Sequence, residues 1–200
     1  MATPELIERR LFAAGDLERT QYVTLYLITE PVEKALEEFQ ALGRTLDSAG
    51  RFFKARRSHL GGPFRLVKTY AAPRMAVDAD AIPYRPNRGV FVTAQDRAEA
   101  STEAALDEAR QWYDQVHIPD LLGVRGVVGC WWFEAMSEGP SPRRRTIRVY
   151  WLDEDPNIFL DDLKAKTPDM SMMDLSKAYR TLLVGAYQSI PWESEFDWFD

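Results

Sequence analysis

Residues 101–135 read STEAALDEARQWYDQVHIPDLLGVRGVVGCWWFEA, and this stretch decides the fold because it holds two different hydrophobic periodicities. From 101 to 117 the apolar side chains recur at the spacing of one helix face; they are Ala105, Ala109, Trp112, Tyr113 and Val116. Ser101 or Thr102 can cap the start of this helix, and we expect Pro119 to end it because the residue before a proline avoids helical geometry. The run GVVGCWWFEA at 126–135 predicts a β-strand.

The elements around this stretch alternate in a simple order. GVFVTA at 89–94 predicts a strand before the helix, and TIRVYWL at 146–152 predicts one after the strand at 126–135. A helix over 156–165 and a strand over 181–190 complete the pattern. The order β-α-β-β-α-β is that of a ferredoxin-like unit, so the predicted class is α+β.

The N-terminal part contains an echo of the same pattern. YLITEP at 26–31 corresponds to YWLDEDP at 150–156, and in both cases a helical pattern follows the proline. We expect a strand over 21–29, a helix from 31 into the fifties and a strand over 64–70. These elements make a partial β-α-β copy. The two matching stretches lie roughly 120 residues apart, and a repeat of that length indicates the duplication of a domain.

The chain is therefore divided into two units. Residues 1–88 form the partial ferredoxin-like unit, with a short helix expected over 4–18 and a linker or a loop over the sheet at 71–88. Residues 89–200 form the complete unit, which ends in an aromatic tail.

Both faces of the predicted strands carry apolar side chains, so the sheet must be covered on both sides. Trp131 and Trp132 put one large aromatic on each face. Helices cover one face, and the other needs a second sheet from the partial first unit, from a partner, or from both. The sequence leaves these three sources of the second layer open.

Composition excludes several classes of protein. Of the 200 residues, two are histidine and one is cysteine, too few for an intrachain disulfide or a four-ligand zinc site. The motifs GxSxG, GxGxxG and the P-loop are absent, so we expect neither a metal nor a cofactor. The net charge of −6 argues against a nucleic-acid partner. With no apolar leader or membrane-spanning run, a cytoplasmic protein is expected.

One short motif resembles a known family. At 112–126 the chain reads WYDQVHIPDLLGVRG, similar to the WYxxxHxPDLLxxxG signature of the dimeric α/β-barrel superfamily, particularly its EthD-like members. The resemblance covers Gly89 to about Trp192, and it departs at Arg125, where many relatives carry proline. The resemblance implies a dimeric α/β-barrel type of sheet in a homodimer. The superfamily includes cofactor-free monooxygenases, polyketide cyclases, muconolactone-type isomerases and haem-degrading enzymes, so the resemblance implies a fold and a pocket more firmly than a reaction.

The candidate catalytic residues are His117, Asp114 and Tyr113. A helix places Asp114 and Tyr113 three and four residues before His117 on one surface, where either could fix the imidazole tautomer and raise its basicity. Asp120 is a candidate second orienting carboxylate, or it bonds a backbone amide. The alternatives are a helix cap for His117, a surface charge for Asp114 and a core or pocket wall for Tyr113.

The candidate substrate-binding residues are mostly aromatic. They are Trp112, Trp131, Trp132, Tyr150, Arg148 and Asp120. Core packing is the alternative for the aromatic side chains, whereas Arg148 either anchors a carboxylate or phenolate or pairs with an acid.

The favoured function is a cofactor-independent enzyme of the isomerase, lyase or cyclase type. It would transfer protons on an apolar or aromatic carbonyl or phenolic compound in a catabolic pathway. The alternatives are a non-catalytic accessory or metabolite-binding barrel, a cofactor-free monooxygenase using the same site, and a haem-binding member.

Overall fold

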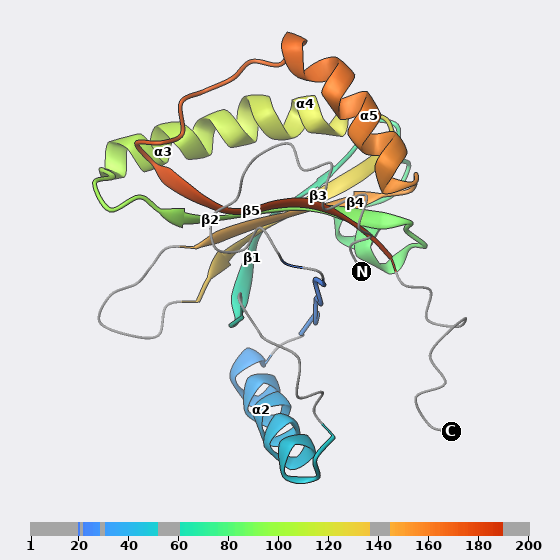
Figure 1. Ribbon diagram of the computed structural model, residues 1–200, viewed down its shortest axis with the longest axis vertical. Coiled ribbons are helices and arrows are strands. Elements are labelled where there is room, and N and C mark those ends of the chain that lie inside the picture. Colours follow the sequence, from blue (N-terminus) through green and yellow to red (C-terminus); the bar gives the residue numbers. More distant parts are fainter. Residues whose placement is uncertain (1–19, 21, 29–30, 52–60, 137–144, 190–200) are drawn as a thin grey trace.

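The computed structural model of the protein describes residues 20, 22–28, 31–51, 61–136 and 145–189, and these residues form an α+β fold (Figure 1). Within them lies a five-stranded sheet in the order β1-β3-β4-β2-β5, with every neighbouring pair antiparallel. The strands are β1 Phe64–Ala71, β2 Gly89–Arg97, β3 Val127–Ala135, β4 Thr146–Leu152 and β5 Tyr179–Gln188. The α+β class predicted from the sequence is confirmed.

The described helices are α2 Val32–Ser48, α3 Glu103–Trp112, α4 Ile118–Leu122 and α5 Pro156–Lys166. Helices α3, α4 and α5 cover one face of the sheet (Figure 1). The side chain of Thr102 accepts a hydrogen bond from the backbone N–H of Ala105 and caps α3, as predicted. None of the helices in the described ranges is long and apolar enough to cross a membrane.

The core has two layers, one on each face of the sheet. The helix-side cluster includes Trp132 and Tyr150, whereas the cluster on the opposite face includes Trp131 and Trp151. On that opposite face lies a 3₁₀ helix, Ala79–Tyr84, whose Ile82 is buried. Residues 71–88, predicted as a linker or a loop over the sheet, thus contain a 3₁₀ helix that packs on this face. The N-terminal part does not supply the predicted second sheet among the described residues, because β1 pairs with β3 in the same sheet.

The predicted strand over 21–29 is wrong for the part that can be described. Residues 22–28 form no strand, and the ring of Tyr26 instead lies 4.9 Å from the ring of Phe39 in α2. Apolar composition favours a strand, but a strand exists only where a neighbour takes its backbone hydrogen bonds. Helix α2 begins within one residue of the predicted start, but it ends at Ser48 and does not run into the fifties, because Gly50 adopts the left-handed conformation with φ of 69°. Three further predictions fall outside the described residues: the helix over 4–18, the part of the long helix after residue 51, and the aromatic tail after 189.

Pro119 does not end the helix, contrary to the prediction. Helix α3 continues into a π-helical turn, Tyr113–His117, and then into α4, whose second residue is Pro119. The backbone N–H of Ile118 donates to the carbonyl of Tyr113, five residues earlier, so the turn is wider than an α-turn. A wider turn relieves the crowding between a proline ring and the preceding turn.

We predict that Gly129→Ala lowers the free energy of unfolding by about 1–3 kcal/mol, the usual cost of overpacking. An added Cβ would meet the Tyr70 carbonyl oxygen at 2.6 Å and Ile82 Cγ1 at 3.0 Å, forcing β1 away from β3. Urea denaturation measures the change. Gly43→Ala in α2 is the matched control, because its Cβ meets nothing within 4 Å and alanine favours a helix. Equal effects of the two substitutions would contradict the prediction.

Candidate functional site

The register of the sheet places polar and aromatic side chains in two rows on the face covered by α3. In the first row Arg148 of β4 lies between Thr93 of β2 and Trp132 of β3. In the second row Tyr150 pairs with Phe91 on one side and Cys130 on the other. Because side chains of a strand alternate, Arg148 and Tyr150 share one face, as the sequence predicted.

Arg148 is fully buried, with 0% of its surface exposed. Its guanidinium carbon lies 3.4 Å from the ring centroid of Tyr113 and 4.5 Å from that of Trp132. Such cation–π contacts offset part of the cost of removing a charge from water. Arg148 is therefore a core residue that keeps its positive charge.

The hydrogen bonds of Arg148 are incomplete. Its Nη1 donates to Gln95 Oε1 at 2.9 Å, and the same oxygen accepts the Tyr113 hydroxyl at 3.0 Å. Arg148 Nε and Nη2 are buried and have no hydrogen-bond partner, and no carboxylate in the described part of the chain pairs with this guanidinium. The hypothesis that Arg148 pairs with an acid is therefore not supported by these residues.

The polar groups around Arg148 are uncharged at neutral pH. Burial raises the pKa of the Tyr150 hydroxyl well above its ordinary value and raises that of the Cys130 thiol to about 12. The pKa of Tyr113 is raised for the same reason. The Thr93 hydroxyl is buried without a hydrogen-bond partner, and the buried Tyr150 hydroxyl lies against the Cys130 thiol. The site therefore combines one fixed cation with several neutral donors.

His117 lies beside this cluster at the end of the π-helical turn. Its imidazole stacks on Trp112 at 4.6 Å between ring centroids and meets the Tyr113 ring edge-on at 5.3 Å. Burial, followed by the charge of Arg148, lowers the pKa of His117 to about 4. The predicted rise in basicity is wrong, because desolvation and a nearby cation both disfavour the imidazolium. Its Nδ1 is buried and has no hydrogen-bond partner.

Asp114 does not orient His117, contrary to the prediction. Its Oδ1 accepts hydrogen bonds from Lys68 Nζ at 2.6 Å and from the Tyr70 hydroxyl at 2.7 Å, and these bonds lower the pKa of the carboxyl. Both donors come from β1. Helical spacing identifies the neighbours of Asp114 on its own helix, but it cannot reveal a competing partner on a distant strand.

The remaining predicted residues divide between the two faces. Trp132 contacts Arg148, and its indole N–H donates to the Thr146 hydroxyl at 2.8 Å. Trp131 lies on the opposite face, where its N–H donates to the Ala79 carbonyl at 2.9 Å, so it does not join the site. Asp120 lies in α4, and none of the described side-chain contacts links it to His117.

Gln95 is the most important site residue that the sequence reading missed. It lies in the apolar run GVFVTAQDR, two residues after Thr93 and four after Phe91 on the same side of β2. A polar residue at an inward position of a buried strand is a signal for a buried partner. The partner is Arg148, itself a charged residue in an otherwise apolar strand.

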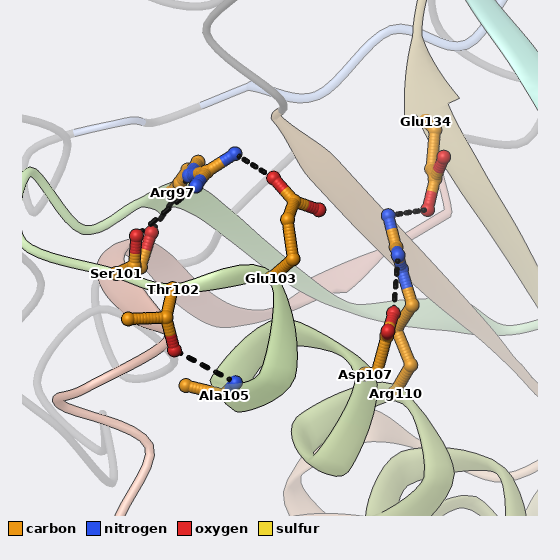
Figure 2. Close-up of polar contacts among 8 residues, drawn as sticks. All are labelled: Arg97, Ser101, Thr102, Glu103, Ala105, Asp107, Arg110 and Glu134. Carbon is orange, nitrogen blue, oxygen red and sulfur yellow. Dashed lines mark hydrogen bonds and ion pairs between the residues drawn. The ribbon is translucent and has the colours of Figure 1, made fainter.

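A small surface depression lies next to the buried cluster, lined by Leu106, Arg110, Glu134, Arg145, Thr146 and Tyr179. Its charged groups are paired: Arg110 contacts Asp107 and Glu134 (Figure 2), and Arg145 bonds Asp96 at 2.6 Å. Nearby, Arg97 is held by Ser101 and Glu103. No three His, Cys, Asp or Glu side chains of the described residues gather as a metal site would need.

We predict that His117 makes the protein less stable in acid. In the unfolded chain the His117 imidazole has its ordinary pKa near 6.5, whereas in the folded protein its pKa is about 4. The unfolded state therefore binds more protons between these values, and stability falls as the pH drops from 6.5 through 4, by about 3 kcal/mol in total. Urea denaturation across this range measures the loss, which is expected to be smaller in His117→Gln.

The imidazole can also be followed directly by proton NMR. With only two histidines, the resonance missing from His117→Gln identifies His117, and that of His59 provides the internal comparison. A His117 titration near 6.5 would contradict the buried, cation-flanked environment described above.

Three comparisons with known proteins bear on this chain. A scan against protein families, a search of curated proteins and a search of solved structures each found no match. These comparisons leave the EthD-like resemblance of residues 112–126 untested, so the function of the site has to be inferred from its own side chains.

Proposed function

We propose that the protein is a cofactor-independent enzyme that moves a proton on an apolar or aromatic carbonyl or phenolic compound. The observation that carries this proposal is a neutral His117 with an unpartnered Nδ1 beside Arg148, a buried cation that no described carboxylate neutralises. A general base needs an unprotonated nitrogen, and a nearby positive charge favours the anion that forms when the proton leaves.

The chemistry requires only these groups. His117 takes a proton from a carbon next to the substrate carbonyl, and the electron pair moves onto the carbonyl oxygen to give an enolate. The Tyr150 hydroxyl and the positive potential of Arg148 stabilise that oxygen. The imidazolium then returns the proton to the same or a neighbouring carbon, which exchanges or isomerises the substrate without a net change in electrons.

The charge of Arg148 also tunes His117 during this cycle. In the free protein the cation lowers the pKa of His117. An anionic oxygen beside Arg148 cancels part of that effect, so the pKa of His117 rises when the proton must be accepted. The base strength of His117 therefore rises as negative charge forms on the substrate oxygen.

The proposed fold is a ferredoxin-like unit of the dimeric α/β-barrel type. The succession β2, α3, β3, β4, α5, β5 and the sheet order β3-β4-β2-β5 support it. The second copy of a homodimer is favoured by large apolar side chains exposed on 22–28, α2 and β1, among them Tyr26, Leu42 and Val67. The cytoplasmic location and the division at residue 88 remain expectations from the sequence.

A non-catalytic metabolite-binding protein is the second candidate. It is favoured because no carboxylate of the described residues orients His117, and Asp114 is engaged by Lys68 and Tyr70. The cofactor-free monooxygenase is a variant of the first candidate, because it begins with the same removal of a proton from a phenol.

We predict that the protein catalyses exchange of deuterium into carbon acids in D₂O, measured by NMR on a panel of aryl ketones and 1,3-dicarbonyl compounds. His117→Gln is expected to lower the exchange rate by about 100-fold or more, as loss of a general base does. Asp107→Asn is the matched control, because this carboxylate lies on α3 and contacts Arg110 rather than the buried cluster. Undiminished exchange in His117→Gln would reject the proposal, and binding without exchange would favour the second candidate.

We predict an unusually acidic limit for the pH dependence of kcat/KM. A base is active in its unprotonated form, and the pKa of His117 in the free protein is about 4. The rate is therefore expected to be level near neutral pH and to fall only as the pH drops through about 4. A fall in kcat/KM with its midpoint near pH 6.5 that is absent from His117→Gln would instead show that His117 has an ordinary pKa.

A further inference from the structure

We infer that the Nε and Nη2 edge of Arg148 binds the carboxylate of a small apolar or aromatic acid. The inference deepens the proposed function, on which its link to catalysis rests: the substrate would be a carbonyl compound that also carries a carboxylate. The binding itself follows from the surroundings of Arg148 and can be tested without any turnover.

The free edge of the guanidinium has the geometry for a carboxylate. Arg148 Nη1 is occupied by Gln95, whereas Nε and Nη2 are buried and unpartnered. These two nitrogens point their N–H bonds in parallel along one side of the planar group, and this fork matches the two oxygens of a carboxylate. A buried donor without a partner is costly, so a built site with two of them favours a ligand that satisfies both.

The faces of the guanidinium are closed to a ligand. The rings of Tyr113 and Trp132 lie over it at 3.4 and 4.5 Å. A partner must therefore approach within the plane of the guanidinium, as a planar carboxylate does in a bidentate pair.

The charge balance selects a single negative charge. The other described cations close to the cluster are paired, Lys68 with Asp114 and Arg145 with Asp96. One unpaired guanidinium can neutralise one carboxylate, whereas a phosphate dianion would retain an unmatched charge in an apolar setting. The aromatic and aliphatic neighbours favour an apolar body for the ligand.

Two hydroxyls lie where they can complete the site. Thr93 is opposite Arg148 in the β2–β4 register, and Tyr150 is two residues along β4 on the same face. Both hydroxyls are buried; that of Thr93 has no hydrogen-bond partner, whereas that of Tyr150 lies against the Cys130 thiol. Ring contacts of Tyr113 connect the cluster to His117 and Trp112, two residues that are only partly buried.

The test uses the full-length protein with sodium benzoate, sodium acetate and benzamide at matched ionic strength. Benzamide has the shape of benzoate without its charge. Benzoate is expected to raise Tm in a concentration-dependent way and to bind in calorimetry, whereas benzamide has no effect. Failure of both carboxylates to raise Tm, or an equal shift by benzamide, would overturn the inference.

Substitutions assign the effect to Arg148. Arg148→Lys keeps the charge but loses the fork, and it is expected to weaken benzoate binding about 10- to 100-fold. The matched control is Arg97→Lys, whose side chain bonds Ser101 and Glu103 and lies outside the cluster; its affinity should match the wild type. Undiminished benzoate affinity in Arg148→Lys would also overturn the inference.

Two further measurements keep the test decisive if Arg148→Lys does not fold. Thr93→Val removes one hydroxyl with little change of shape and should weaken benzoate binding severalfold. In the wild type, benzoate should move the NMR titration of His117 upwards from its ligand-free value, a shift that a purely structural Arg148 would not produce. If neither change occurs, Arg148 does not bind carboxylates.

The outcome for binding is separable from the outcome for catalysis. His117→Gln is expected to bind benzoate with wild-type affinity while losing deuterium exchange. Carboxylate binding by a wild-type protein that shows no exchange would reject the proposed function alone. Exchange that is indifferent to benzoate, together with no binding, would reject the carboxylate site alone.

Discussion

The burial of Arg148 among aromatic rings is the constraint on which the helix-covered face of the sheet depends. Its guanidinium lies over Tyr113 and Trp132 and is tied through Gln95 to the Tyr113 hydroxyl. Burial, together with this charge, holds the neighbouring imidazole in its neutral form. One cation therefore contributes to the packing of α3 on the sheet, to the orientation of Gln95 and to the protonation of the site.

Burying an arginine without an acidic partner lowers the stability of the fold. Replacing a buried ionic group by apolar side chains of similar volume is often neutral or stabilising. Elsewhere in the described chain the strongly held arginines have acidic partners, as Arg145 has in Asp96 and Arg74 has in Asp153. Arg148 is the departure from that pattern, and departures from locally consistent design are expected at functional sites.

Much of the fold could be predicted from short-range patterns. The period of the apolar side chains indicated α3, α5 and the strands, and strand alternation correctly put Trp131 and Trp132 on opposite faces. Pairing between distant segments could not be predicted. The apolar run 22–28 has the composition of a strand, but its strand character depends on a neighbour, and the partners of Asp114 come from β1 because β1 lies beside β3. Arg148 and Tyr150 were identified as one face, whereas Gln95 needed the register of β2 against β4.

The π-helical turn also makes the motif tolerant of a change in length. Five residues, Tyr113–His117, occupy a turn whose hydrogen bond spans one residue more than that of an α-helix. The wider turn absorbs the extra residue, so the helix beyond it keeps the phase that a regular helix one residue shorter would give it, at about 100° per residue. Ile118, Leu121 and Leu122 are buried in that phase. Deleting the exposed Gln115 would therefore close the turn to a regular helix and leave all three facing the sheet.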